Sequence, residues 1–409
     1  MLQGAQTNRI VRFFESFDLS SDLVVSVVPM KTTHVARDGR RYKNVNGVMY
    51  EVKFEKNGFF AMGMLKTTKK NMDNLLIEYA TGLFLNPYCS IVPSFVATYG
   101  IYKLPGKMTR KLSVDDLRGL TMIDLQGYDW QRQCDEADQC VLLTQKIDKA
   151  VTLHTFIDRN KHCRKYIMGM MFQLYYSLYA VRDRFTHYDL HMNNVLVYDF
   201  GGPVNFVFTH PDDPKMKKTF SCRFLVKVID YSRAYFRADN GLSSESLFAQ
   251  IDETTCKWDR MYQYAKNSFN ATHHLKLMGY VMEAVAEQQF GRNEFSVMAE
   301  MLRNRTMKSQ EELLNYFFRY DFNVYANEVA TLEADGRTEM VFRKTSVKPT
   351  FEDDSDLKTP ATVVNSEEEG EHVSAFGSMP GERLDMSSAS PSIRSPPTKK
   401  TRRSSTSRN

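Results

Sequence analysis

The most informative stretch of the chain is Thr186-His187-Tyr188-Asp189-Leu190-His191-Met192-Asn193-Asn194-Val195-Leu196. It places a carboxylate, Asp189, five residues before a carboxamide, Asn194, directly after a long apolar run. A second carboxylate, Asp230, ends the strand-like run 224–229. Phosphoryl transfer from a nucleotide needs one carboxylate to orient the attacking hydroxyl, and a carboxamide and a carboxylate to hold magnesium. The two stretches therefore offer three residues for three separate chemical roles.

Upstream of this stretch the sequence predicts a small β-sheet. Residues 48–54 and 59–66 are strand-like, and the Asn57-Gly58 pair between them is a strong hairpin signal. Two further strands are expected at 95–102 and 140–144. The polar stretch 103–138 is expected as an insertion between them.

One helix is expected between the second and third of these strands. Asp73 can cap it, and Leu75, Tyr79 and Leu83 give it an apolar face at four-residue spacing. Asn86-Pro87 then ends it, because proline disfavours a helical residue before it.

From Thr152 onward the chain is expected to be mostly helical. The expected helices cover 152–158, 162–184, 275–290 and 310–320. A strand pair is expected at 195–198 and 223–229, separated by the polar segment 201–221.

Composition limits the classes of protein. The 409 residues suffice for one two-lobed domain or two ordinary domains, and 42% hydrophobic residues indicate a packed body. A net charge of +5 is too small to indicate nucleic-acid binding, except through the basic C-terminal run. The six cysteines are scattered without a Cys-x-x-Cys spacing, which favours a reducing intracellular compartment. The longest apolar run, 166–181, falls short of a membrane span, so no membrane partner is expected.

Seen together, residues 41–325 resemble a protein kinase, and more narrowly the divergent serine/threonine protein kinases of large DNA viruses. Besides the stretch 186–196, the strings that carry the resemblance are Met64-Leu65-Lys66-Thr67, Ile77-Glu78-Tyr79-Ala80-Thr81-Gly82-Leu83, Phe95-Val96-Ala97-Thr98-Tyr99-Gly100 and Ile229-Asp230-Tyr231-Ser232-Arg233.

The resemblance implies an α+β, two-lobed protein-kinase-like fold. It implies an N-terminal extension (1–40), a small β-rich N-lobe (41–147) and a larger helical C-lobe (148–343). Residues 344–409 are rich in Ser, Pro and basic side chains and poor in large apolar ones, so we expect a disordered tail.

The resemblance also implies a site for ATP and Mg²⁺. Lys66 would hold the α- and β-phosphates and Glu78 would hold that lysine. Asp189 would orient the hydroxyl, and Asn194 and Asp230 would ligate Mg²⁺. The adenine is expected near 143–147.

Several positions depart from the family pattern. Gly47 would belong to the loop that covers the phosphates, but 44–48 is no G-x-G-x-x-G. His191 stands where these kinases commonly have lysine; it can still donate a hydrogen bond to the transferring phosphate. Tyr188 replaces an arginine, and Ser232 replaces a glycine. His187 is expected to fix the loop through a structural hydrogen bond. His273-His274 stands where a buried aspartate is expected.

Three alternatives stay open. A small-molecule kinase of the aminoglycoside or choline type has a similar loop, and a pseudokinase scaffold would explain the poor glycine loop. A metallohydrolase built from His187, Asp189 and His191 is less favoured, because the segment follows a helix and is expected to be a loop.

The partner expected for a kinase is a viral or host protein with a Ser or Thr acceptor. The tail itself is a second candidate acceptor, because Ser404, Ser405 and Ser407 lie beside Arg402 and Arg403. The basic run 399–403 is interpreted either as a nuclear import signal or as a solvated tail. The expected location is the host cytoplasm or nucleus, with packaging in a virion as an alternative.

Overall fold

The computed structural model describes residues 24–30, 33–35, 41–43, 48–56, 59–67, 75–104, 111–117, 120–125, 140–159, 164–249, 268–287, 293–322 and 330–344. All of them belong to one compact unit, Met1–Thr362. This part of the chain is a mixed α+β structure, as predicted, with sheet dominant in its N-terminal part and most of the helices later. The predicted tail lies outside the described residues, apart from Lys344.

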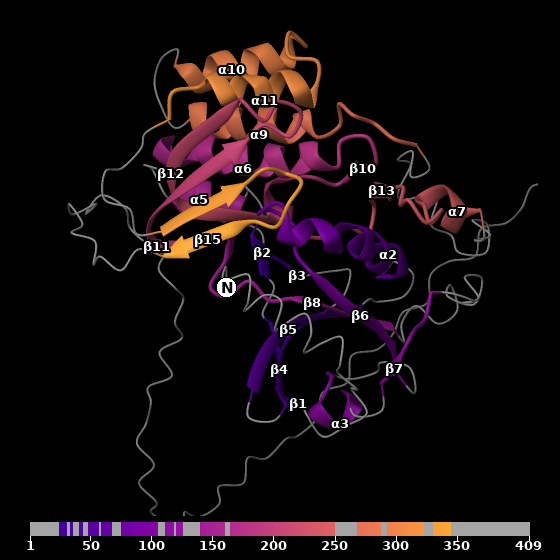
Figure 1. Cartoon of the computed structure of the whole chain (residues 1–409). Coiled ribbons are helices and arrows are strands. Elements are labelled where there is room, and N and C mark those ends of the chain that lie inside the picture. The colour runs from indigo at the N-terminus through magenta and orange to yellow at the C-terminus, as the bar shows by residue number, and fades with distance from the viewer. Residues whose placement is uncertain are drawn as a thin grey trace, which may run out of the picture. The chain divides into compact units, whose positions relative to one another are not determined.

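The N-terminal sheet has six strands, shown together in Figure 1, with every neighbouring pair antiparallel. Their order is β1 (Val24–Pro29), β4 (Met49–Lys56), β5 (Phe59–Thr67), β8 (Cys140–Gln145), β6 (Thr98–Lys103) and β7 (Thr121–Met122). The predicted hairpin is confirmed, since Lys56 pairs with Phe59 and Met49 with Lys66. Its turn, Asn57-Gly58, lies outside the described residues. Strand β1 comes from the stretch expected as an N-terminal extension.

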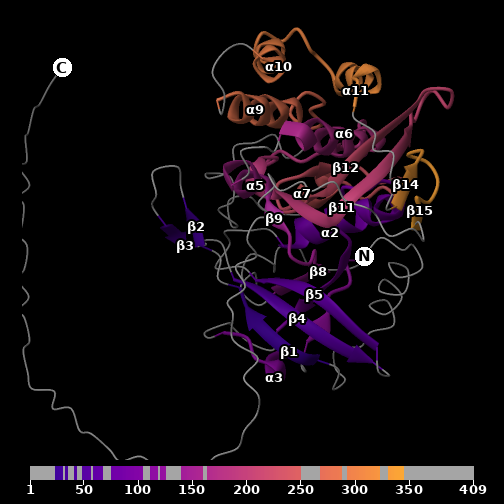
Figure 2. The ribbon, with the colours of Figure 1, turned by 90° about the vertical axis from the view of Figure 1, so that its left-hand side faces the viewer.

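Short elements flank this sheet. Strands β2 (Thr33–Val35) and β3 (Arg41–Lys43) pair with each other as a separate ribbon (Figure 2). Helix α3 (Val114–Leu117) and strand β7 lie in the stretch 103–138 that was expected as an insertion.

Helix α2 (Leu75–Leu85) continues into the 3₁₀ turn η1 (Asn86–Ser90), close to where Asn86-Pro87 was expected to end it. The prediction of an apolar face containing Leu83 is wrong: Leu83 is 37% exposed. Every other residue of α2 is buried, including Glu78 and Thr81. Because the helix is enclosed on nearly all sides, four-residue spacing does not identify a single inner face. The expected cap, Asp73, lies outside the described residues.

The segment 201–221 was predicted to be a polar connection between two short strands, and this prediction is wrong. Strands β11 (Val195–Thr209) and β12 (Lys217–Val228) form one long antiparallel hairpin through it. Buried apolar side chains recur at every second position of both strands, at Val204, Phe206 and Phe208 in β11 and at Phe220 and Cys222 in β12. The prediction failed because this period-two pattern was obscured by the residues between them, which include the polar Asn205 and Ser221.

The hairpin belongs to a second sheet, with the order β12-β11-β14-β15, and β9 (Val151–Thr152) also pairs with β11. Strand β14 (Ala330–Ala334) is parallel to β11, and β15 (Val341–Lys344) is antiparallel to β14; neither was predicted. Aromatic rings from β11, β12, helix α6 (Arg164–Ala180) and helix α11 (Gln310–Arg319) pack together beneath this sheet, for example Phe172 against Phe220 and Phe317. This aromatic layer fixes helix α6 against the sheet.

The main helices of the second half are α5 (Leu153–Arg159), α6 (Arg164–Ala180), α7 (Ser244–Phe248), α9 (Leu275–Ala286), α10 (Glu294–Arg303) and α11 (Gln310–Arg319). Helices α9, α10 and α11 lie on the same side of α6 in both views (Figures 1 and 2). The expected helices are found with shifted ends, and α10 is additional. Asn293 and Ser296 start α10 with a reciprocal capping box.

A substitution at Gly82 tests how tightly α2 is held. A Cβ there would lie 2.6 Å from the Cβ of Thr98, whose backbone N–H and carbonyl are both bound by the side chain of Asn86. We expect Gly82→Ala to lower the free energy of unfolding by about 1–3 kcal/mol through overpacking. The matched control is Gly279→Ala in α9, where a Cβ meets nothing within 4 Å and better helix propensity should add up to about 1 kcal/mol. Urea unfolding of both variants measures this; equal effects would contradict the tight α2 contact.

Candidate functional site

Lys66, Glu78 and Asp230 meet at one point, although they come from three separate elements. The ammonium of Lys66, at the end of β5, lies 2.8 Å from Oε2 of Glu78 on α2. The same ammonium lies 3.0 Å from Oδ1 of Asp230, which follows β12. The side chains of Lys66 and Glu78 are only 14% and 7% exposed. One shielded cation therefore joins the sheet, the helix and the segment after the long hairpin.

Asp230 is held in an unusual backbone conformation. Its φ is +67°, a left-handed value that is costly for a residue with a Cβ. Ser232 donates a hydrogen bond of 2.9 Å to Oδ1. Burial opposes ionisation of the carboxyl, but the charge and hydrogen bond of Lys66, with that of Ser232, outweigh it and lower the pKa of Asp230 to about 2. Asp230 is a carboxylate throughout the physiological pH range.

Asp189 and Asn194 lie on the loop between β10 (Phe185–Thr186) and β11. The loop ends in the 3₁₀ turn η3 (Met192–Asn194). The Asn194 amide donates to the backbone carbonyl of Asp189 over 2.9 Å, which leaves its Oδ1 as the oxygen for a further ligand. The Ile229 N–H donates to the Asn194 carbonyl over 3.0 Å. These bonds set Asn194 against the residue that precedes Asp230.

His187 makes the structural hydrogen bond that was predicted. Its ring Nε2 lies 3.0 Å from the carbonyl oxygen of Ile229, and its Nδ1 accepts from the Asp189 N–H. Burial lowers the pKa of His187 from its ordinary value. The neutral ring thus links the loop to the strand end that carries Asp230.

His274 supports the same loop from below. Its Nε2 accepts a 2.9 Å hydrogen bond from the His187 N–H, and the side-chain amide of Gln310 lies 2.8 Å from its Nδ1. The Tyr175 hydroxyl donates to the His274 carbonyl over 2.6 Å. The ring is fully buried, and burial lowers the pKa of His274 to about 3. The neutral ring of His274 therefore accepts the hydrogen bond from the His187 N–H, at a position where the resemblance implied a buried aspartate.

Two nitrogen-bearing side chains, the Arg233 guanidinium and the His191 imidazole, lie beside Asp189. Arg233 Nη1 lies 3.3 Å from Asp189 Oδ1, and His191 Nε2 lies 3.9 Å from the same oxygen. Tyr188 points elsewhere: it has a left-handed φ of +56° and its hydroxyl donates to the Ser268 carbonyl over 2.6 Å. The arginine at this place in the site comes from the segment after Asp230 and not from the loop.

Buried hydrogen bonds next to the site join the end of β12 to the segment that precedes β6. The Val228 N–H donates to the Ser94 carbonyl, and the Lys227 ammonium donates 2.8 Å to the Phe95 carbonyl. Burial lowers the pKa of Lys227 to about 8. Near 143–147, the Gln145 N–H donates to the Ala97 carbonyl. These bonds fix the strand end before Asp230 against the segment that leads into β6.

The structure thus brings together five predicted residues, called here the five-residue cluster: Lys66, Glu78, Asp189, Asn194 and Asp230. His191 lies at its exposed edge. Gly47 lies outside the described residues, so its predicted role has no structural account.

The oxygen donors of the cluster suit Mg²⁺. The ion prefers hard oxygen ligands and commonly takes one or two protein groups together with phosphates. Asp230 offers a carboxylate and Asn194 an amide oxygen. In the described part of the chain, no group of three or more His, Cys, Asp or Glu side chains has metal-site geometry. The Nε2 of His187 lies at the Ile229 carbonyl and so is not directed at a metal, which counts against the metallohydrolase alternative.

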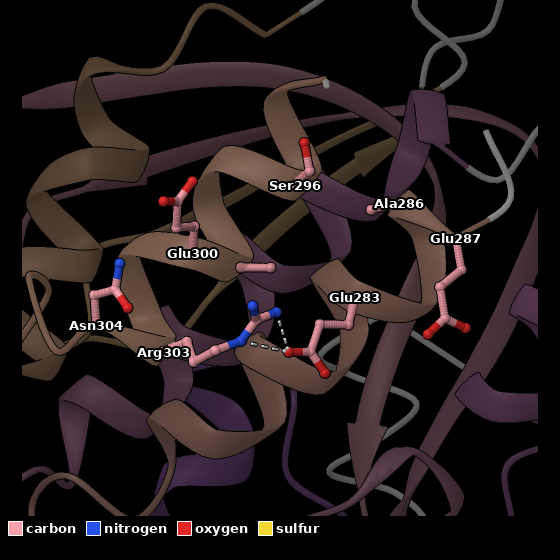
Figure 3. A pocket seen from close by; sticks show the side chains of 8 residues that line it. Glu283, Ala286, Glu287, Ser296, Glu300, Arg303 and Asn304 are labelled. Carbon is pink, nitrogen blue, oxygen red and sulfur yellow. Dashed lines mark hydrogen bonds and ion pairs between the residues drawn. The ribbon is translucent and has the colours of Figure 1, made fainter. Parts of the chain in front are cut away.

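Two hollows lie elsewhere, on the face formed by α9 and α10. One of about 800 Å³ is lined by Glu283, Glu300 and Arg303 among others, and Figure 3 shows Arg303 turned toward Glu283, 2.7 Å away. A neighbouring hollow of about 530 Å³ shares Glu283 and Arg303. Neither hollow contains a residue of the five-residue cluster.

No protein-family model matches the sequence, and a search of curated proteins also gives no match. Among the helices of the described residues, none is both long and apolar enough to cross a membrane.

Arg233, His274 and Gln310 were not predicted as site residues. Arg233 and His274 both lie in stretches that were compared with the kinase pattern. Their contacts with Asp189 and His187 join residues 44 and 87 positions apart, which the sequence alone does not indicate. Gln310 starts α11 and carries no motif. No local sequence signal identifies it.

The buried histidines predict acid sensitivity. His187 and His274 are fully buried and their pKa values are lowered, so the unfolded chain binds their protons first as the pH falls below about 6.5. Their stabilising contribution is complete above that pH and is lost toward the lower folded pKa values. We expect the free energy of unfolding to fall by more than about 1 kcal/mol per pH unit between pH 6 and 5, because each proton taken up contributes about 1.4 and the unfolded chain takes up most of one at His274 alone. Urea unfolding at several pH values measures the slope; a flat profile would contradict the neutral histidine pair.

Proposed function

We propose that this protein is an ATP- and Mg²⁺-dependent phosphotransferase with a protein-kinase-like fold, and that it phosphorylates Ser or Thr hydroxyls of proteins. The observation that carries the proposal is the double ion pair of Lys66 with Glu78 and Asp230. A shielded lysine between two carboxylates, one on a helix and one beside an asparagine, is the arrangement that phosphoryl transfer from ATP requires.

Each residue of the cluster has a distinct part in this proposal. Lys66 binds the α- and β-phosphates, and Glu78 keeps its ammonium in place. Asn194 and Asp230 hold Mg²⁺, which neutralises charge on the phosphates. Asp189 accepts a hydrogen bond from the acceptor hydroxyl and takes its proton as the bond to phosphorus forms.

The proposed kinase-like fold is supported by the order of the elements. An antiparallel sheet bearing Lys66 is followed by α2 bearing Glu78, and a mostly helical part carries the loop with Asp189. The long β11–β12 hairpin and strands β14 and β15 are additions of this chain to the simpler arrangement expected from the sequence.

The acceptor distinguishes a protein kinase from a small-molecule kinase, which would use the same five residues. A protein acceptor is preferred because several strings of the sequence resemble those of protein kinases. The assay below therefore offers both kinds of acceptor.

Asp189→Asn tests the proposal. The full-length protein is incubated with γ-labelled ATP, Mg²⁺ and a basic protein, or with an aminoglycoside or choline. We expect label in protein, and a decrease of about 10²–10⁴-fold in Asp189→Asn, because the amide cannot accept the proton. The matched control is Asp158→Asn, an aspartate paired with His154 on the surface of α5, which should transfer at the wild-type rate.

The other outcomes are distinct. Label in the small acceptor alone would replace the protein kinase by a small-molecule kinase. Nucleotide binding without transfer to any acceptor would favour the pseudokinase. Equal rates in wild type and Asp189→Asn would remove Asp189 from the proposed mechanism.

A further inference from the structure

The segment that follows β12 touches two of the three carboxylates of the site. Asp230 itself accepts from Ser232, and Arg233 reaches across to Asp189, with Nη1 3.3 Å from Oδ1. The side chains of Arg233 and Asp189 are 25% and 24% exposed. The pair is therefore partly open to solvent and is not part of the closed core.

Arg233 is the permanent cation at Asp189. His191 is farther from the carboxylate, at 3.9 Å, is 47% exposed, and is charged only when its ring is protonated. The ammonium of Lys66 is already shared between Glu78 and Asp230. A guanidinium keeps its charge at all physiological pH values.

The charges of the site favour such a group. The site contains three carboxylates, Glu78, Asp189 and Asp230. Lys66 pairs with Glu78 and Asp230, whereas the guanidinium paired with Asp189 is that of Arg233. A further fixed cation there reduces the repulsion between Asp189 and the terminal phosphate.

We infer that Arg233 binds the terminal phosphate of ATP and holds it beside Asp189. The inference rests on the proposed function and adds a residue to it. A guanidinium has five N–H donors in a rigid fork, so one Arg233 can contact Asp189 and a phosphate oxygen together.

In the proposed transfer step, one bond to the γ-phosphorus forms and another breaks. The acceptor oxygen forms a bond to the γ-phosphorus, and the bond from that phosphorus to the β–γ bridging oxygen breaks. The bridging oxygen keeps the electron pair and leaves in ADP. The hydroxyl proton passes to Asp189. Arg233 stays bound to the transferred phosphoryl group throughout.

ADP lacks the phosphate that Arg233 binds, so the affinity ratio between the two nucleotides tests the inference. Dissociation constants of Mg·ATP and Mg·ADP are measured by titration calorimetry for wild type, Arg233→Gln and Arg233→Lys. We expect Arg233→Gln to weaken the binding of Mg·ATP by about 10- to 100-fold, because one charge-assisted hydrogen bond is lost. The binding of Mg·ADP should weaken by less than about twofold. Arg233→Lys should recover part of the loss, because it restores the charge without the fork.

The matched control is Arg223→Gln. Arg223 is also paired with an aspartate, Asp199, and the two side chains are 18% and 21% exposed, but the pair lies on the β11–β12 hairpin. It should leave the ATP-to-ADP ratio unchanged. Thermal unfolding of each variant shows that the fold is intact.

The failures can be told apart. If wild type binds ATP and transfers phosphate but Arg233→Gln keeps the wild-type ratio, the role of Arg233 is overturned and the proposed function stands. A tighter ATP complex or a faster transfer in Arg233→Gln would show that Arg233 instead blocks Asp189. If wild type binds neither nucleotide, the inference and the proposed function both fall.

Discussion

The ion pairs of Lys66 are the constraint on which the rest of the site depends. They bring together β5, α2 and the segment after β12, and a shielded cation of this kind is costly unless its partners are in place. The position of α2 follows from it, since Glu78 must face Lys66 while Gly82 allows the helix to approach Thr98. The position of Asp230 follows as well, and with it the left-handed backbone at that residue.

A second network holds the loop that carries Asp189. His187 connects the loop to the end of β12, and His274 and Gln310 support His187 from α9 and α11. These groups are buried and neutral, so they position the loop through hydrogen bonds alone. The two networks meet at Ile229 and Asp230. We interpret this meeting as the reason why a loop from the middle of the chain can be aligned with a lysine of the N-terminal sheet.

The sequence predicted the elements whose signals are local. The β4–β5 hairpin followed from its alternation and its Asn-Gly turn, and Lys66, Glu78, Asp189, Asn194 and Asp230 followed from motif order. The 201–221 hairpin was missed because polar residues such as Asn205 and Ser221 separate its apolar ones, although both are buried in the structure. Leu83 was misplaced because α2 is enclosed on nearly all sides. Arg233 and His274 act through contacts between distant segments, which spacing along the chain does not reveal.

The proposed function requires that Lys66, Asn194 and Asp230 form a metal-dependent polyphosphate site. This can be measured by calorimetric titration of the wild type and of Asp230→Asn with ATP, each with and without Mg²⁺. We expect Mg²⁺ to tighten ATP binding to the wild type by about tenfold or more, and Asp230→Asn to lose this dependence, because the variant lacks the charged metal ligand. Equal Mg²⁺ dependence in the two proteins, or no ATP binding by the wild type, would contradict it.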